Sequence, residues 1–498
     1  MTEINQSPQA APVPLQVLVR LVSRLDSEGI RYCHWKSNEH LADAMAGNTD
    51  VDLLVDPAHM FRFDDAARQL GFVEALAPSF IQLPGVRHLY SLDSSTGRLA
   101  HVHVHDRLVL GELRVKNHRL PVEGWLLDHR IHKLGVPIPE PRAELLLLYV
   151  RSLMKTTLRA SARTVAGRQE HPFPKEIRGE LADLLDQVDD DAVVGTIDEA
   201  QVSLDPAGLA EFIRRVRADD IPVGYVLAAR RRLRAEMRPY RRYGPVVAAA
   251  RKVWLRLRFS RPWRVFSPLP AKRPAGGGLI IGVVGADGSG KTTLTHDLVA
   301  WLSRTLRTEH VYFGQPKNDL ILHGTRRVNR RLRNREAGLG RGSAAFHEIV
   351  RTFQWLYIAV RRRRTARLVN RLQSRGGLVV AERYPLPEFW KMENPMDGPR
   401  LGTRRRGPAY WERRIYEAIP RPDLILVLRA DLAALKTRKP LTPEDEVFAK
   451  HTAVERLIET HDPALKVLDA DRPYEEVLHA AKLAIWDSLV SESATGVR

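Results

Sequence analysis

One short segment constrains the fold of this chain more than any other. Residues 285–292 read GADGSGKT and match the pattern G-x-x-x-x-G-K-[ST] at every fixed position. The apolar residues 279–284 in front of it are predicted to form a strand, and residues 291–306 behind it a helix. Such glycines let backbone N–H groups turn inward around phosphate oxygens, and the helix directs the positive end of its dipole at the same point. The sequence therefore predicts a phosphate-binding loop between a buried strand and a helix.

The residue types in this loop indicate candidate roles. Lys291 would place a positive charge at the β and γ phosphates of a nucleotide, and the Thr292 hydroxyl would ligate Mg²⁺. ATP and Mg²⁺ are therefore the expected cofactors, and the substrate is expected to be a nucleotide or another phosphorylated small molecule. The loop residues expected to bind the nucleotide are Gly285, Gly288, Ser289, Gly290, Lys291, Thr292 and Thr293.

The rest of the C-terminal half alternates between strands and helices. Apolar runs at 310–313, 377–381, 423–428 and 464–468 are predicted strands, and 344–373 is a predicted long helix. Apolar runs without polar alternation are typical of parallel strands that are covered on both faces. We therefore expect an α/β fold in which a parallel P-loop sheet carries helices on both faces.

Three motifs in this half resemble those of thymidylate kinases. They are VVGADGSGKTTL at 283–294, VVAERY at 379–384, and PDLILVL at 422–428, the last followed by a helix and the basic sequence KTRK. The second motif resembles the family's Asp-Arg-Tyr with glutamate in place of aspartate, and the third resembles its fourth strand and lid. The resemblance spans residues 279–488 and implies ATP-dependent phosphoryl transfer to a nucleoside monophosphate such as dTMP.

The same resemblance implies roles for single side chains. Asp287 or Glu382 would orient the acceptor or a metal-bound water, and Arg383 would hold the acceptor phosphate. The phosphate loop contains no arginine, so the cation at the transition state would come from the lid. Arg438 is the first candidate for that cation and Lys436 the second.

The chain departs from the thymidylate kinase pattern where the acceptor would bind. The predicted helix at 344–373 lacks the family's Asp-Arg pair, and Pro-Leu-Pro follows Tyr384 where a small hydroxyl residue is usual. Three kinds of acceptor are therefore compatible with the sequence: dTMP, another nucleotide, or a different phosphorylated or hydroxylated compound.

Two aspartates in the N-terminal part indicate a second site. Asp50 and Asp52 belong to the predicted strand at 50–55, and residues i and i+2 of a strand point to one face, so that both carboxylates can share one metal ion. Together with Trp-Lys-Ser at 35–37, they resemble nucleotidyltransferases, in which a Gly-Ser turn contacts the triphosphate and two aspartates share Mg²⁺. The resemblance covers residues 15–155 and implies an α+β nucleotidyltransferase-like domain.

A third carboxylate normally joins such a site from a neighbouring strand, and here we look for it at 98–108. His103 stands at the expected position, and Asp106 has the opposite strand parity. His101, His103 and His105 share one face of this strand, where they could bind a transition metal. A partly exposed polar strand face is the interpretation that the sequence alone favours.

Positive charge is concentrated in one segment. The formal net charge is +19, and residues 230–273 hold fifteen Lys or Arg against a single acid, Glu236. Prolines within this segment and glycines at 276–278 are typical of a domain boundary, and a short basic helix is predicted at 244–259. The expected domains are a nucleotidyltransferase-like domain at 1–155, a helical extension at 156–229, a basic Pro/Gly-rich linker at 230–275, and a P-loop kinase domain at 276–498.

Composition restricts the covalent chemistry and the cellular location that we expect for the protein. Cys33 is the only cysteine, which excludes an internal disulfide and a cysteine-built zinc site. No apolar run reaches the length of a membrane-spanning helix, and residues 1–14 lack the features of a signal peptide. A cytoplasmic protein, peripheral at an anionic membrane surface through 230–275, is expected. The sequence contains no nucleic-acid recognition module, which argues against a DNA or RNA partner.

Three functions remain open from the sequence. The first is a thymidylate kinase-like enzyme, and a homodimer of the kind that such kinases form would be compatible with this function. The second is a bifunctional nucleotidyltransferase and kinase of polysaccharide or specialised-metabolite synthesis. The third is a non-catalytic, nucleotide-sensing adaptor at a membrane surface.

Overall fold

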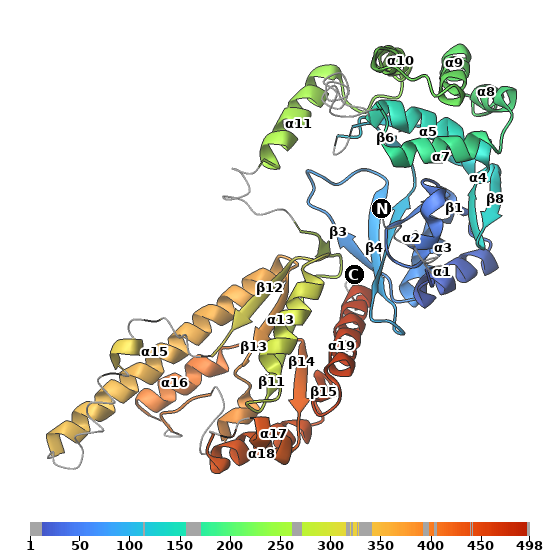
Figure 1. Cartoon of the computed structure of the whole chain (residues 1–498). Coiled ribbons are helices and arrows are strands. Elements are labelled where there is room, and N and C mark those ends of the chain that lie inside the picture. Colours follow the sequence, from blue (N-terminus) through green and yellow to red (C-terminus); the bar gives the residue numbers. More distant parts are fainter. Residues whose placement is uncertain are drawn as a thin grey trace, which may run out of the picture. The chain divides into compact units, whose positions relative to one another are not determined.

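The computed structural model divides the chain into two compact units, Met1–Pro270 and Ala271–Arg498 (Figure 1). Each unit contains its own hydrophobic core. The residues that the structure describes are 12–112, 115–155, 171–260, 271–314, 319, 322–325, 327, 341–391, 398–402, 406–438, 440 and 442–495. Residues 261–270 of the predicted linker and Lys439 of the basic KTRK motif lie outside these ranges.

The first unit is built around a mixed sheet. Its strands lie in the order β1-β2-β5-β4-β3. β2 and β5 run parallel, whereas β1 with β2, β4 with β5 and β3 with β4 are antiparallel. The strand bounds are β1 Tyr32–His34, β2 Val51–Val55, β3 Val73–Leu76, β4 Val86–Leu92 and β5 Leu99–His105. This α+β region corresponds to the fold class expected for the N-terminal part.

Helices cover one face of this sheet because their apolar residues recur at helical spacing. In α1 (Gln16–Ser27), Leu18, Leu21 and Leu25 are fully buried, and they share a core with Phe63 of α3 (Met60–Gln69). Short elements connect the strands, namely η1 Asn38–His40, α2 Leu41–Met45 and η2 Pro57–His59.

A helical layer with two small hairpins completes the first unit. Its central helix is α5 (Pro141–Lys155), which is buried on almost every side, with residues 145–148 at most 1% exposed. The other described helices in this part of the first unit are α4 Glu123–Asp128, α7 Lys175–Leu185, α8 Asp190–Glu199, α9 Pro206–Arg217, α10 Val223–Glu236 and α11 Pro245–Arg258. The hairpins are β6 Leu108–Leu110 with β7 His118–Leu120, and β8 Arg130–Lys133 with β9 Val136–Pro139.

The beginning of the segment predicted as a linker is part of the first unit. α10 continues past residue 230, and Val226, Arg230, Leu233 and Met237 are buried at a spacing of one helical face. Leu233 and Met237 belong to the same core as α5. The helix α10 therefore extends into the segment expected to be a linker, and the arginines at 231, 232 and 234 lie on its exposed side.

The second unit contains a fully parallel sheet. Its strands lie in the order β12-β13-β11-β14-β15, and every neighbouring pair is parallel. The strand bounds are β11 Ile280–Gly285, β12 Thr308–Tyr312, β13 Leu378–Glu382, β14 Leu424–Arg429 and β15 Leu465–Asp469; a two-residue strand, β10, spans Arg273–Pro274.

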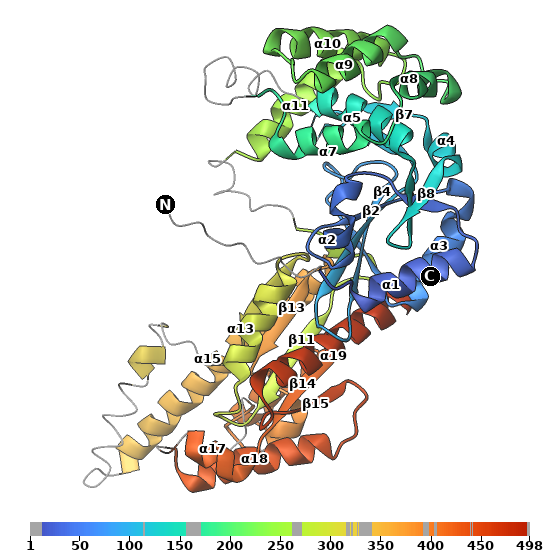
Figure 2. The ribbon, with the colours of Figure 1, turned by 45° about the vertical axis from the view of Figure 1, so that its right-hand side comes forward.

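Helices cover this sheet on both faces, which confirms the predicted architecture (Figure 2). Val369 of α15 and Leu457 of α18 pack in one core with Val379 and Val427 of the strands. On the opposite face, α13 and α19 pack against each other and against the strands. The elements are α13 Lys291–Leu302, α15 Arg341–Ser374, η4 Pro387–Lys391, α16 Pro408–Glu417, α17 Leu432–Arg438, α18 Glu444–Ile458 and α19 Tyr474–Thr495.

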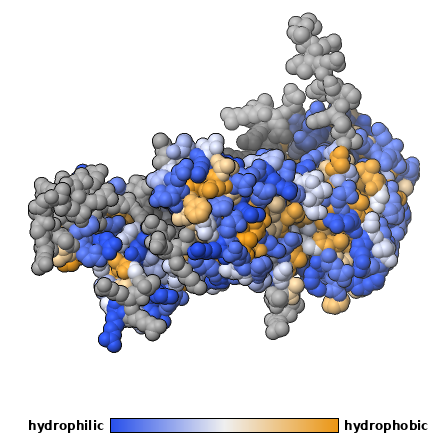
Figure 3. Space-filling view, turned by 90° about the horizontal axis from the view of Figure 1, so that it is seen from below, coloured by the Kyte–Doolittle hydropathy of each residue, from blue (hydrophilic) through white to orange (hydrophobic). Residues whose placement is uncertain are grey.

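The face seen in Figure 3 is largely hydrophilic and carries hydrophobic residues in small groups. Among the described residues, no helix has both the length and the apolar composition that crossing a bilayer requires.

Candidate functional site

The predicted phosphate loop joins the carboxyl end of β11 to the first turn of α13. Gly290 precedes the helix with φ 91°, and Gly288 also has φ 91°, a conformation that favours glycine. A Cβ atom on Gly285 would lie 2.8 Å from the carbonyl oxygen of Leu428 and 2.7 Å from Ser289 Oγ. The loop backbone can therefore approach β14 this closely only because no side chain intervenes.

Two polar contacts fix the start of α13. Lys291 is buried, and its Nζ donates a hydrogen bond to the carbonyl oxygen of Ala286 at 2.6 Å, inside the loop. Thr292 Oγ1 donates to Glu382 Oε1 at 2.8 Å. Glu382 ends β13, the strand next to β11, and is 4% exposed. A hydroxyl and a carboxylate thus lie side by side at the carboxyl edge of the sheet, which is a donor set that Mg²⁺ prefers.

Asp287 lies among three cations at the same edge. Its carboxylate is 2.9 Å from Arg383 Nη2, 2.7 Å from Lys450 Nζ and 3.7 Å from Lys291 Nζ. Burial alone would raise the pKa of Asp287, but the hydrogen bond from Lys450 and the charges of Arg383 and Lys291 outweigh burial and lower it to about 2. Arg383 has φ 58°, a strained conformation for a residue with a side chain, directly beside Glu382.

The sequence gives no signal that Lys450 of α18 lies at this site. It lies 163 residues after Asp287 in the chain and belongs to no motif. The nearest local signal is its i,i+4 pair with Glu446, which reads as an ordinary helix surface contact. Only the fold brings α18 to the phosphate loop.

Arg438, expected at the transition state, has a different partner. Its Nη2 lies 3.2 Å from Asp471 Oδ1 and 3.2 Å from the carbonyl oxygen of Ala470. The helix that carries it, α17, is nevertheless anchored beside the loop, because Leu435 packs on Ala286. The second candidate on this helix also has a partner of its own, since Lys436 Nζ lies 3.2 Å from Glu444 Oε1.

A second polar cluster surrounds Asp52 in the first unit. Asp52 pairs across β2 and β5 with His103, and its Oδ1 lies 2.7 Å from Lys36 Nζ, 3.2 Å from His103 Nδ1 and 3.3 Å from His105 Nε2. Burial would raise the pKa of Asp52, but the hydrogen bonds of His103 and His105 and the charge of Lys36 lower it well below its usual range. Burial also lowers the pKa of His105 to about 4.

Asp50 contacts two histidines, whereas Asp52 also contacts Lys36. Its Oδ1 lies 2.6 Å from His101 Nδ1, and its Oδ2 lies 3.7 Å from His103 Nε2. Both aspartates therefore reach the ring of His103, in agreement with the strand parity that the sequence indicated.

Further cations, which belong to no sequence motif, lie around Asp52. Arg151 Nη2 donates to Ser37 Oγ at 3.2 Å, and its guanidinium lies 5.8 Å from the ring of Trp35. Burial and the charge of Lys36 lower the pKa of Lys116 to about 8. A carboxylate surrounded by lysine and arginine is a poorer Mg²⁺ site than the paired aspartates alone suggested.

Comparisons with known proteins place the chain in a family. No protein-family model matches it. The uncharacterised ATP-binding protein YghR of Escherichia coli K12 is 31% identical over 225 residues, which are 41% of this chain and 86% of the relative, and the YghR of E. coli O6:H1 matches equally well. The uncharacterised ATP-binding protein YghS of E. coli K12 is 28% identical over 226 residues, which are 42% of this chain and 93% of that relative. The chain therefore belongs to the family of the uncharacterised ATP-binding protein YghR.

Proposed function

We propose that residues 276–498 form an ATP-dependent kinase of the thymidylate kinase type, which phosphorylates a nucleoside monophosphate or a related acceptor. The observation that carries this proposal is the glycine-lined loop after β11, with Thr292 bonded to Glu382 at its helical end. The relatives YghR and YghS are named ATP-binding proteins, which supports the part of the proposal that concerns ATP binding.

The donor side of the reaction uses the loop. The backbone of 285–290 and the ammonium of Lys291 would bind the β and γ phosphates of ATP. Thr292 and Glu382 would hold Mg²⁺, which neutralises phosphate charge when bound. Glu382 is held in place by its position at the end of a buried strand, so its carboxylate is preorganised for this contact.

The acceptor side uses the cations around Asp287. Arg383 would bind the acceptor phosphate through its planar guanidinium, and Asp287 keeps that side chain in place through the 2.9 Å contact. We assign the transition-state cation to Lys450 rather than to Arg438, because Lys450 contacts Asp287 whereas Arg438 contacts Asp471. Phosphoryl transfer depends mainly on such positioning and charge neutralisation.

ADP release by the purified full-length chain tests this proposal. The chain is incubated with ATP and Mg²⁺ and a panel of nucleoside monophosphates, with dTMP first, and of sugar phosphates. We expect acceptor-dependent turnover that Lys291→Ala abolishes and that Lys450→Ala lowers at least about tenfold. Lys466→Ala is the matched control, because Lys466 is an exposed lysine on β15, and it should keep wild-type turnover.

The outcomes of this assay separate the alternatives. Turnover of dTMP alone would establish the thymidylate kinase assignment, and turnover of another acceptor would redirect it. ATP binding without turnover of any acceptor would refute the kinase proposal and favour the adaptor. Equal losses in Arg438→Ala and Lys450→Ala would refute our choice of the transition-state cation.

A second candidate function, attachment to an anionic membrane surface, is favoured by α11. Its buried residue Leu255, the T-shaped contact between the rings of Trp254 and Phe80 with centroids 5.2 Å apart, and the 2.7 Å hydrogen bond from Arg251 to the carbonyl oxygen of Phe80 attach it to the first unit. The opposite side exposes an apolar stripe flanked by arginines, as in helices that lie at a bilayer interface. The exposed fractions in this stripe are 78% for Val246, 56% for Val247, 56% for Val253, 46% for Trp254 and 59% for Leu257.

Vesicle co-sedimentation tests the membrane candidate. We expect the chain to bind vesicles containing phosphatidylglycerol and to be released by salt, because basic segments interact with anionic lipid through screened charges. The double variant Val253→Ala with Leu257→Ala, which leaves the contact of Trp254 with Phe80 in place, should weaken binding about tenfold or more. Phe61→Ala is the control, since Phe61 is 77% exposed on α3 outside this stripe. Equal binding to neutral vesicles, or no effect of the double variant, would contradict the candidate.

A further inference from the structure

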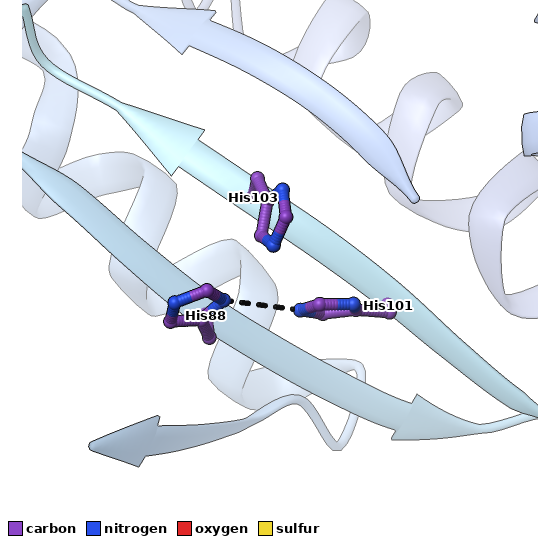
Figure 4. A group of neighbouring side chains, drawn as sticks. All are labelled: His88, His101 and His103. Carbon is purple, nitrogen blue, oxygen red and sulfur yellow. Dashed lines mark hydrogen bonds between the residues drawn. The ribbon is translucent and has the colours of Figure 1, made fainter. Parts of the chain in front are cut away.

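Three histidine rings face one another on adjacent strands of the first unit (Figure 4). His88 lies on β4, and His101 and His103 lie on β5. In the antiparallel pairing His88 stands directly opposite His103, while His101 is opposite Tyr90. All three rings therefore project from the same face, and each is only partly buried.

The spacing of these rings suits a metal ion. His88 Nδ1 and His101 Nε2 are 3.2 Å apart, and one nitrogen from each of the three residues lies within 4.8 Å of the others. Zinc binds histidine nitrogens at about 2.0–2.1 Å in a tetrahedral arrangement, which places two ligand nitrogens about 3.3 Å apart. The nitrogens of His88 and His101, which are hydrogen-bonded to each other in the structure, already have this separation (Figure 4).

Carboxylates behind the rings orient them for this task. His101 Nδ1–H donates a hydrogen bond to Asp50 Oδ1 at 2.6 Å, so that in the neutral ring the lone pair is on Nε2, the nitrogen facing His88. Tyr90 stacks on the ring of His101 at 4.1 Å with an interplanar angle of 8°. His103 Nδ1 contacts Asp52 Oδ1 at 3.2 Å. A carboxylate behind a metal-binding histidine is the usual outer-shell arrangement.

We propose that His88, His101 and His103 bind a divalent transition metal of the Zn²⁺ class. Three imidazoles are a donor set that prefers such ions to Mg²⁺ or Ca²⁺. Three protein ligands leave one coordination position for water or a small ligand, which is the arrangement of reactive rather than purely structural zinc sites. The site is independent of the phosphate loop and of the proposed kinase function.

The trio differs from the one that the sequence indicated. His105 shares the strand face, but it is 2% exposed and its Nε2 lies 3.3 Å from Asp52 Oδ1. An alternative group of Asp52, His103 and His105 also has the right separations. We favour His88 over that group because Lys36 already contacts Asp52 at 2.7 Å, and its ammonium would repel a cation there.

Metal titration of the untagged full-length chain tests the site. The protein is treated with chelator, and Zn²⁺ is then titrated by calorimetry without nucleotide, with Co²⁺ absorption as a report of tetrahedral nitrogen coordination. We expect one ion per chain. Binding should weaken about 100-fold or more in His88→Gln and in His101→Gln, and about 10- to 100-fold in Asp50→Asn, which keeps the ligands but removes the carboxylate.

Two control variants make the test decisive. His132 is an exposed histidine on β8, and His132→Gln should bind Zn²⁺ like the wild type. His105→Gln should also keep the affinity within about twofold, and each variant is checked by its melting temperature before titration. Loss of binding in His105→Gln with none in His88→Gln would overturn the proposed trio in favour of the Asp52 group. Absence of stoichiometric binding in the wild type would overturn the site altogether.

Discussion

Replacement of Asp287 by asparagine should destabilise the second unit. The carboxylate contacts three cations, and their combined effect lowers its pKa from 3.8 to about 2. A shift of this size corresponds to about 2 kcal/mol of favourable interaction with the ionised form. The side chain is 30% exposed, so solvent screening reduces the expected loss in Asp287→Asn to about 1–2 kcal/mol at pH 7. Because the pKa is depressed, the contribution is present above about pH 4 and is lost as the pH falls toward 2.

Hydrogen exchange measured by mass spectrometry can follow this loss in the intact chain. Amides of the buried strands β11 and β14 exchange through unfolding of their unit, so a loss of 1–2 kcal/mol should speed their exchange about 5- to 30-fold. Peptides from β2 in the first unit serve as an internal reference and should not change. Glu417→Gln is the matched variant, since Glu417 is a surface acid 41% exposed on α16, and its effect should be near zero. Exchange of β11 and β14 in Asp287→Asn that equals the wild type would refute the electrostatic reasoning.

Two further variants test other parts of the structure. Burial raises the pKa of Glu180 to about 7, so the folded unit favours the protonated acid and loses stability as the pH rises from about 4.5 through 7. Glu180→Gln should therefore raise the calorimetric melting temperature of the first unit by several degrees at pH 8 and leave it unchanged at pH 5. No gain in melting temperature at pH 8 would contradict the assignment. Gly285→Ala would place a Cβ atom 2.8 Å from the carbonyl oxygen of Leu428 and should lower the free energy of unfolding, measured by urea denaturation, by about 1–3 kcal/mol. Gly179→Ala is the control, because its Cβ would meet no atom within 4 Å and should not destabilise the protein. Equal denaturation midpoints for the two variants would refute the steric argument.

The sequence predicted those features that depend on local pattern. The loop at 285–292 requires glycines and a lysine at fixed positions between a strand and a helix, so the motif determines its own surroundings. The parallel sheet of the second unit followed from apolar runs that lack alternation, and the structure confirms it. In the first unit, the spacing of Asp50 and Asp52 predicted a shared face, and both residues do contact His103.

Features that depend on distant pairing could not be predicted. Lys450 reaches Asp287 only because α18 packs against the sheet. His88 meets His101 and His103 through the register of an antiparallel pair, which the strand sequences alone do not fix. The packing of α10 against the first unit could not be predicted either, because the exposed arginines at 231, 232 and 234 stand next to the few buried residues that attach the helix.

Binding of Mg²⁺–ATP to the full-length chain tests the central claim most directly. Isothermal titration should give one nucleotide site per chain, with affinity that depends on Mg²⁺ through Thr292 and Glu382 and that Lys291→Ala lowers about 30-fold or more. Lys466→Ala should bind like the wild type. Equal affinity of Lys291→Ala and the wild-type chain for Mg²⁺–ATP would contradict the assignment of residues 285–292 as the nucleotide site.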